Sequence, residues 1–192
     1  MVVVEGVSAL TWQQYIPQVI EEPDTILRPL IPSAKGERVV FTNRKQRLPP
    51  AAYRVEGSSW HVVINVARQN GSPFLDLELG RNQMDSFLRG CVICSAVPHV
   101  ICVMPDHLHL LAEIGPVGLI DLVRRMKSSS TKLWWRQGGR DELWQESFYD
   151  HGIRDTQDFE AIAKYILHNP IEAGLVAEWE SYRLVGGRLV EP

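Results

Sequence analysis

The sequence lacks the features that mark membrane and secreted proteins. No apolar run approaches the roughly 20 residues that cross a bilayer, and Met1–Glu5 do not begin a basic segment followed by a long apolar one. The 192 residues include only three cysteines, an odd number that argues against a disulfide framework and fits a reducing compartment. We therefore expect a cytoplasmic protein with no membrane partner.

Composition is ordinary for a globular chain, but charge is distributed unevenly. Hydrophobic residues make up 45% and charged residues 22% of the chain, enough for one domain with a sizeable core. The net charge of −3 gives no general attraction to nucleic acid. Residues 35–54 and 119–140, however, each carry six Lys or Arg against one acidic residue. Such patches fit a polyanion footprint, but they also fit ordinary solvated faces, which are the commoner case.

Prolines divide the chain into unequal parts. Six fall within residues 1–55 and interrupt any long element there, so we expect an irregular basic N-terminal extension. A compact domain over 56–180 and a short tail over 181–192 follow. No internal repeat or low-complexity tract is present.

Within the compact domain, hydrophobic periodicity predicts strands and helices in the order β-α-β-β-α-β-α. This order is that of a ferredoxin-like split βαβ antiparallel sheet, an α+β fold, with an added C-terminal helix that Pro170 should stop near residue 168. The tight connection at 105–106 predicts an antiparallel hairpin. The expected strands cover 60–67, 97–104, 107–114 and 143–153, and the expected helices cover 81–96, 118–137 and 155–168.

Two histidines stand two residues apart in the third of these strands. Alternation along a strand sends His107 and His109 to one face and Leu108 and Leu110 to the core. Two parallel imidazoles on a rigid strand form an incomplete metal site, because divalent ions take further oxygen ligands or water. The alternative is a pair of polar residues on the wet face of an antiparallel strand.

The last helix carries two more candidates. Tyr165 and Asn169 are four residues apart and so lie one turn apart on one helix face. Against the histidines, they would supply a nucleophilic phenol and a third, amide ligand. Alternatively, Tyr165 is a residue at the rim of the helix and Asn169 is its C-cap.

Three segments together resemble the REP-associated tyrosine transposases, which are single-tyrosine HUH transposases of the insertion-sequence type. They are VMPDHLHLL at 103–111, WQESFYDH at 144–151 and YILHNPIEAGLV at 165–176, and the similarity spans about 60–176. The resemblance implies the HUH nuclease fold, with a C-terminal catalytic helix. It also implies cleavage and strand transfer of palindromic, REP-like hairpins of single-stranded DNA.

The resemblance also implies a role for each matching residue. His107, His109 and Asn169 would bind Mg²⁺ or Mn²⁺, and Tyr165 would be the nucleophile that forms a 5′-phosphotyrosine. Tyr149 lies where relatives often carry another aromatic residue or a histidine, so we do not expect it to be the nucleophile. The covalent link conserves the bond energy, so no ATP site is required, and no G-x-x-x-x-G-K-[ST] motif is present.

Other residues are expected to contact the DNA. His151 and Arg154 match polar positions near the site of the family. Phosphates favour cations and hydroxyls, and the basic second helix offers both. Its candidate DNA-binding residues are Arg124, Lys127, Ser128 and Lys132. One of its two adjacent tryptophans, Trp134 or Trp135, should be buried and the other free to stack on a base.

Several alternatives stay open at this stage. The protein could nick DNA without rejoining it, or be a domesticated DNA-binding protein with little strand transfer. We expect a monomer or a homodimer, associated with the nucleoid when bound to DNA. The C-x-x-C pair Cys91 and Cys94, with His99 and Cys102, could form a zinc site, but buried free thiols are the favoured interpretation.

Overall fold

The computed structural model describes residues 48–190. The predicted N-terminal extension therefore lies almost wholly outside the described residues. Within residues 48–190, no helix is long and apolar enough to cross a membrane.

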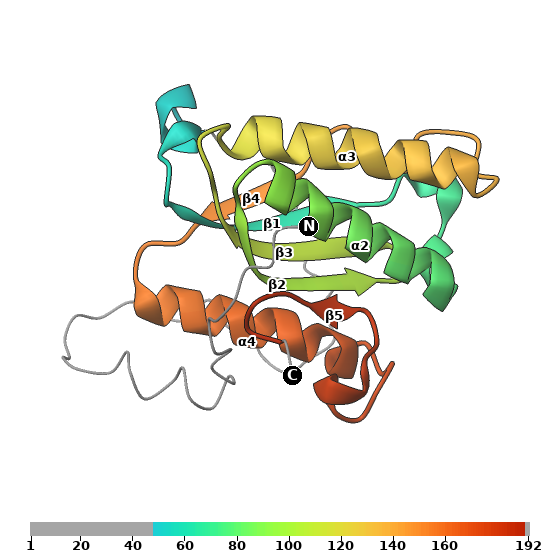
Figure 1. Cartoon of the computed structure of the whole chain (residues 1–192). Helices are drawn as coiled ribbons and strands as arrows, with labels where there is room; N and C mark the ends of the chain where they lie inside the picture. Colours follow the sequence, from blue (N-terminus) through green and yellow to red (C-terminus); the bar gives the residue numbers. More distant parts are fainter. Residues whose placement is uncertain (1–47, 191–192) are drawn as a thin grey trace, which may run out of the picture.

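A five-stranded antiparallel sheet forms the centre of the molecule (Figure 1). Its spatial order is β4-β1-β3-β2-β5, and the first four strands have the arrangement of a ferredoxin-like sheet. The α+β prediction is confirmed. The strands are β1 (Ser59–Asn65), β2 (Val97–Met104), β3 (His107–Glu113), β4 (Tyr149–Gly152) and β5 (Val185–Gly186).

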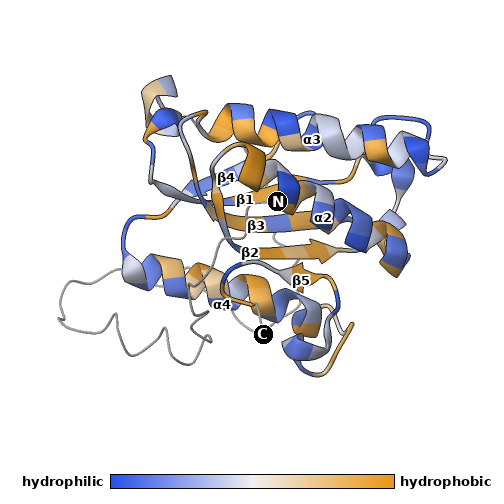
Figure 2. Cartoon of the chain, in the orientation of Figure 1, coloured by the Kyte–Doolittle hydropathy of each residue, from blue (hydrophilic) through white to orange (hydrophobic). Residues whose placement is uncertain are grey.

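Three helices cover the two faces of this sheet (Figure 1). Helices α2 (Leu77–Ile93) and α3 (Leu119–Arg136) pack on one face over the larger core cluster. Helix α4 (Thr156–Glu172) covers the other face over a second cluster. Figure 2 shows apolar strands between these helices, so the sheet is buried on both sides along its central strands.

Local signals explain where the first two of these helices begin and end. The carboxylate of Asp76 accepts hydrogen bonds from the backbone N–H groups of Glu78 and Leu79, so α2 begins four residues before its predicted start. Helix α3 follows Gly118, whose φ of 76° suits glycine, and it ends at Arg136, close to the prediction.

Helix α4 continues through Pro170, against the prediction that this proline would stop it. Proline removes its own N–H donor and crowds the carbonyl four residues earlier, but here its ring is buried, and tertiary packing can override such local costs. The side-chain amide of Asn169 donates to the backbone carbonyl of Tyr165 at 2.7 Å. After the last turn, the Leu175 N–H donates to the Pro170 carbonyl. Gly174, with φ of 69°, follows the last turn.

Both ends of the described chain contribute to the core beyond the expected limits of the compact domain. Tyr53, inside the predicted extension, is buried and stacks on Trp60 with ring centroids 5.2 Å apart. In the expected tail, Leu184 is completely buried and β5 pairs with β2. The Tyr182 hydroxyl donates to the Val103 carbonyl at 2.8 Å. Tyr182, Leu184 and β5 therefore pack against the sheet and the core.

Candidate functional site

The two histidines of β3 lie on the sheet face that α4 covers. His109 is only 2% exposed, because α4 packs over the middle of the strand. His107 stands at the start of the strand, and its side chain remains 24% exposed. The alternative of two polar residues on a wet face is therefore wrong for His109.

A line of hydrogen-bonding groups passes through the histidine pair. The Nε2 atoms of His107 and His109 are 3.0 Å apart. Asp106 Oδ1 lies 2.7 Å from His107 Nδ1, and the Nε2 of His61 lies 3.1 Å from His109 Nδ1. His61 is not among the site residues predicted from the sequence. Its only signal was a histidine within a β-branched strand, and its partner stands 48 residues away.

Strand register explains why His61 reaches His109. Val63 of β1 is flanked by His109 of β3 on one side and by Tyr149 of β4 on the other. His61 lies two residues before Val63 and therefore faces the same side of the sheet, next to His151 of β4. The α4 side of the sheet thus gathers polar rings from three strands.

Tyr165 and Asn169 of α4 meet these rings from above. The Tyr165 ring is edge-on to His109, with centroids 5.6 Å apart, and to His61, with centroids 6.1 Å apart. The Asn169 side chain is within hydrogen-bonding reach of both Tyr165 and His109. The structure therefore brings Tyr165, Asn169, His107 and His109 together.

Burial sets the protonation of this cluster. Burial lowers the pKa of His109 well below its usual value, and the nearby His107 and His61 lower it further, although the Asn169 hydrogen bond opposes them. Burial, with His151 nearby, lowers the pKa of His61 to about 4. Both imidazoles are neutral near pH 7 and have a lone pair to offer.

The phenol of Tyr165 is harder to ionise than a free one. Burial raises its pKa, the hydrogen bond from Asn169 lowers it, and the negative charge of Glu172 raises it. A protonated phenol is a weak nucleophile. A nucleophilic role for Tyr165 would therefore require that its proton be removed as the new bond forms.

The donor atoms fit a small divalent ion. Two ligands at about 2.1 Å, set at a right angle, are roughly 3.0 Å apart, which matches the 3.0 Å between the Nε2 atoms of His107 and His109. An amide oxygen from Asn169 would make a third ligand. Among residues 48–190, no three His, Cys, Asp or Glu side chains form a metal-binding group, so the candidate set depends on this amide.

Tyr149, the other tyrosine considered from the sequence, lies at the edge of the cluster. It is 38% exposed on β4, and its ring is edge-on to His61 with centroids 6.2 Å apart. Nearby, His151 Nε2 is 2.9 Å from the Asp158 carboxylate, which also accepts from the Arg154 backbone N–H at 3.2 Å. His151 and Arg154 thus lie on the same side of the sheet as the site.

The four candidate DNA-binding residues of α3 lie on the opposite side of the sheet from α4 (Figure 1). Arg124 is 72% exposed and pairs with Asp121 at 2.7 Å. Ser128 and Lys132 are exposed. Lys127 differs, because its ammonium donates to the carbonyls of Gln145 and Glu146, at 2.9 Å for the latter, and so anchors the segment that leads into β4.

The structure shows which of the two adjacent tryptophans on α3 is buried. Trp134 is partly buried and packs against the larger core cluster. Trp135 is 50% exposed, and its indole N–H donates to the Asp141 carbonyl at 3.0 Å. Trp135 is therefore the one whose ring is open to a stacking partner.

The cysteines are buried free thiols, as favoured from the sequence. Burial raises the pKa of Cys91, with Cys94 adding to it, and that of Cys102, each to about 12. Thiols of this kind stay protonated at neutral pH in the absence of a metal. With no metal-binding group among residues 48–190, the zinc alternative has no support.

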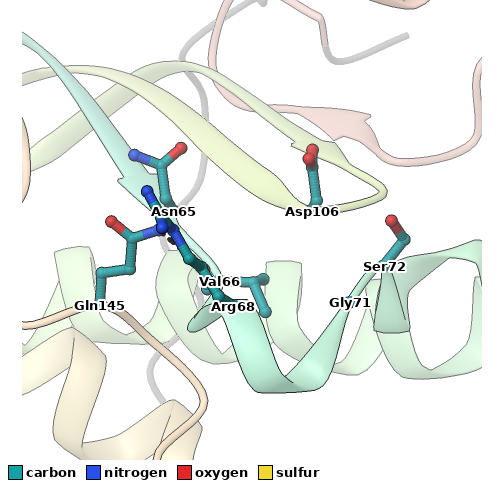
Figure 3. Close-up of a pocket in the computed structure, with 7 residues that line it drawn as sticks. All are labelled: Asn65, Val66, Arg68, Gly71, Ser72, Asp106 and Gln145. Carbon is teal, nitrogen blue, oxygen red and sulfur yellow. Dashed lines mark hydrogen bonds between the residues drawn. The ribbon is translucent and has the colours of Figure 1, made fainter. Parts of the chain in front are cut away.

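An open polar pocket of about 290 Å³ lies where β1 ends, beside the β2–β3 turn (Figure 3). Asn65, Arg68 and Gln145 gather on one side of it, and Asp106 and Ser72 stand on the other. Asn65 pairs with His107 across the β1–β3 ladder, so the pocket adjoins the histidine pair. Its lining residues are Asn65, Val66, Arg68, Gly71, Ser72, Asp106 and Gln145.

The chain is similar to known transposases. The family model described as "Transposase IS200 like" matches residues 89–169, which include the histidine pair, Tyr165 and Asn169. The REP-associated tyrosine transposase of Escherichia coli (strain K12) is 32% identical over 131 residues, covering 66% of this chain and 74% of that protein. The chain belongs to the REP-associated tyrosine transposases.

The chain is also similar to a second curated protein and to a solved structure. An uncharacterised protein of Haemophilus influenzae is 26% identical over 165 residues, covering 69% of this chain and 90% of that protein. The solved structure of a REP-associated tyrosine transposase bound to a REP hairpin aligns with a TM-score of 0.58 and 22% identity. It covers 69% of this chain and 78% of that one. At this identity the match shows a shared fold.

Proposed function

We propose that this transposase cleaves and rejoins single-stranded DNA at palindromic, REP-like hairpins through a covalent bond to Tyr165. The observation that carries the proposal is the meeting of four side chains from two elements distant in sequence. Tyr165 and Asn169 of α4 stand over His107 and His109 of β3. A hairpin as the substrate is supported by the structural relative, a REP-associated tyrosine transposase that was solved bound to a REP hairpin.

In the proposed site, His107, His109 and Asn169 hold Mg²⁺ or Mn²⁺. When bound, such an ion neutralises the nonbridging oxygens of a phosphodiester and polarises the phosphorus toward attack. Burial keeps His109 neutral, so its lone pair is free at neutral pH. The side chain of His107 is partly open to solvent, which leaves room on that side for a strand of DNA.

The covalent step exchanges one phosphodiester bond for another. The Tyr165 oxygen forms a bond to phosphorus, the bond from phosphorus to the 3′ oxygen breaks, and the phenol proton is transferred so that the 3′ oxygen leaves as a hydroxyl. Rejoining reverses the step when a 3′-hydroxyl attacks the phosphotyrosine. Because α4 holds Tyr165 and Asn169 one turn apart, the nucleophile has a fixed position relative to a metal ligand, and such orientation is worth several kcal/mol in reactions of this kind.

Covalent capture tests this function. Labelled single-stranded DNA carrying the palindromes that flank the gene is incubated with the full chain and Mn²⁺, and adducts are resolved under denaturing conditions. Tyr165→Phe should give no adduct and still bind the hairpin, whereas Tyr149→Phe, the matched control near His61, should still give one. Mass spectrometry should place the nucleotide on Tyr165. A nucleotide on Tyr149 would refute the assignment.

The alternatives differ in outcomes of the same experiment. An adduct that forms but is never passed to a second 3′-hydroxyl would indicate a nicking enzyme without strand transfer. Tight hairpin binding with no adduct in the wild-type chain would indicate a domesticated DNA-binding protein. The wild-type protein distinguishes the three functions without any substitution.

A further inference from the structure

His61 is a buried polar residue that the proposed reaction does not use directly. It lies in the middle of β1 and is 3% exposed. Its Nε2 is 3.1 Å from Nδ1 of His109, and the two ring planes are inclined by only 16°. The rings therefore meet edge to edge, as in a hydrogen bond between two imidazoles.

The chemistry of a metal-binding imidazole decides which way this hydrogen bond runs. A neutral imidazole carries one proton, so a ring that binds an ion through Nε2 must carry it on Nδ1. The Nε2 atoms of His107 and His109 face each other at 3.0 Å, so both Nδ1 atoms would carry protons. Asp106 accepts from the first at 2.7 Å, and His61 is the corresponding acceptor for the second.

We propose that His61 is a positioning residue that accepts the Nδ1 proton of His109 and so holds the Nε2 lone pair of His109 toward the ion. The inference rests on the proposed metal site. Partners of this kind fix the orientation of a ligand, and their loss typically weakens metal binding by about 10–100-fold. Both rings are almost fully buried, so solvent water does not reach Nδ1 to replace the acceptor.

The two histidines have different hydrogen-bond acceptors at Nδ1. His107 has a carboxylate partner with a 62% exposed side chain, and solvent can reach the pair. His109 lies beneath α4, where a buried carboxylate would pay a large desolvation cost. A neutral imidazole accepts the same hydrogen bond without burying a charge.

Mn²⁺ binding without DNA measures the role of His61 apart from catalysis. The free Mn²⁺ signal in electron paramagnetic resonance gives the dissociation constant for wild type, His61→Phe and His61→Gln. His61→Phe keeps a buried ring without an acceptor and should bind Mn²⁺ about 10–100-fold more weakly. His61→Gln restores an acceptor oxygen and should recover most of the affinity. Circular dichroism checks folding, and His61→Leu replaces His61→Phe should the latter not fold.

His99 provides the matched control. It is also a buried histidine on the α4 side of the sheet, 8% exposed and edge-on to Phe159, but it does not contact the histidine pair. His99→Phe should bind Mn²⁺ like wild type. Equal loss in His99→Phe and His61→Phe would overturn the proposal in favour of a general packing effect.

The tautomer of His109 gives a second readout that needs no metal. Long-range ¹H–¹⁵N correlation spectra of the metal-free chain should show the His109 proton on Nδ1 in wild type and His61→Gln, and a shift toward Nε2 in His61→Phe. Unchanged Mn²⁺ affinity and an unchanged tautomer in His61→Phe would overturn the role of His61 alone. A wild-type chain with no Mn²⁺ affinity would overturn the proposed metal site, and this role with it.

Discussion

Replacing the two histidines of β3 separately should have unequal effects on stability. Alternation along the strand places both on one face and does not distinguish them. His109 is 2% exposed, with hydrogen-bonding partners at both ring nitrogens. His109→Ala should therefore lower the free energy of unfolding, while His107→Ala, at a partly exposed position, should change it by less than about 1 kcal/mol.

The size of the effect follows from two losses. Truncating a buried side chain of this size leaves a cavity, and the Nε2 of His61 loses its partner, which by itself costs about 1–3 kcal/mol for a buried polar group. Relief of the buried imidazole's own desolvation offsets part of this. We expect a net loss of about 2–4 kcal/mol, which for a chain of this length lowers Tm by roughly 5–15 °C.

Thermal and urea unfolding of wild type, His107→Ala and His109→Ala measure this difference. Equal Tm values for the two variants, both close to wild type, would refute the burial argument. The result also governs how activity data are interpreted. Loss of cleavage in His107→Ala would implicate the metal site, whereas loss in His109→Ala requires the folding measurement first.

Three further predictions concern acid stability, DNA binding and the C-terminal segment. Burial lowers the pKa of His61 and of His99 to about 4, so the unfolded chain binds more protons between about pH 6.5 and 4. The free energy of unfolding should fall as pH drops through this window, by about 2 kcal/mol per histidine at pH 5. Urea unfolding at a series of pH values should show a smaller fall for His99→Phe than for wild type. Arg124→Ala with Lys132→Ala should weaken hairpin binding and flatten its salt dependence; equal affinity for random duplex DNA would contradict specific hairpin recognition. Leu184→Ala should cost about 2–4 kcal/mol in urea unfolding, because Leu184 is fully buried, and a wild-type midpoint would show that the tail is dispensable.

Much of the fold was predictable from local patterns. The β2–β3 hairpin follows from two apolar runs joined by two residues, and β2 has the predicted bounds. The end of α4 was not predictable from Pro170. The helix continues past this proline to Glu172, because tertiary packing can outweigh the local cost of a proline in a helix. Strand β5 has two residues and depends on its pairing with β2, for which the sequence gives no periodic signal.

Part of the candidate site was likewise predictable from the sequence, and part was not. The pairs His107 with His109 and Tyr165 with Asn169 each follow from spacing within one element, and the structure brings the two pairs together. His61 was missed because its contact with His109 depends on the register between β1 and β3. Sequence spacing shows which residues share an element, whereas the packing of separate elements determines which of them meet.

The positions of the basic residues restrict how DNA can lie on this protein. Arg124 and Lys132 are on α3, and Tyr165 is on α4, across the thickness of the sheet (Figure 1). No single phosphate can contact both groups. A hairpin that reaches both must pass around an edge of the sheet, and β4 is the edge strand nearest to the site. In the proposed reaction, α3 therefore contacts the DNA away from the cleaved bond.

Replacing the basic residues of α3, Arg124 and Lys132, should then weaken binding with little effect on the cleavage rate of bound DNA. Arg154→Ala, next to β4 on the side of the site, should instead affect that rate.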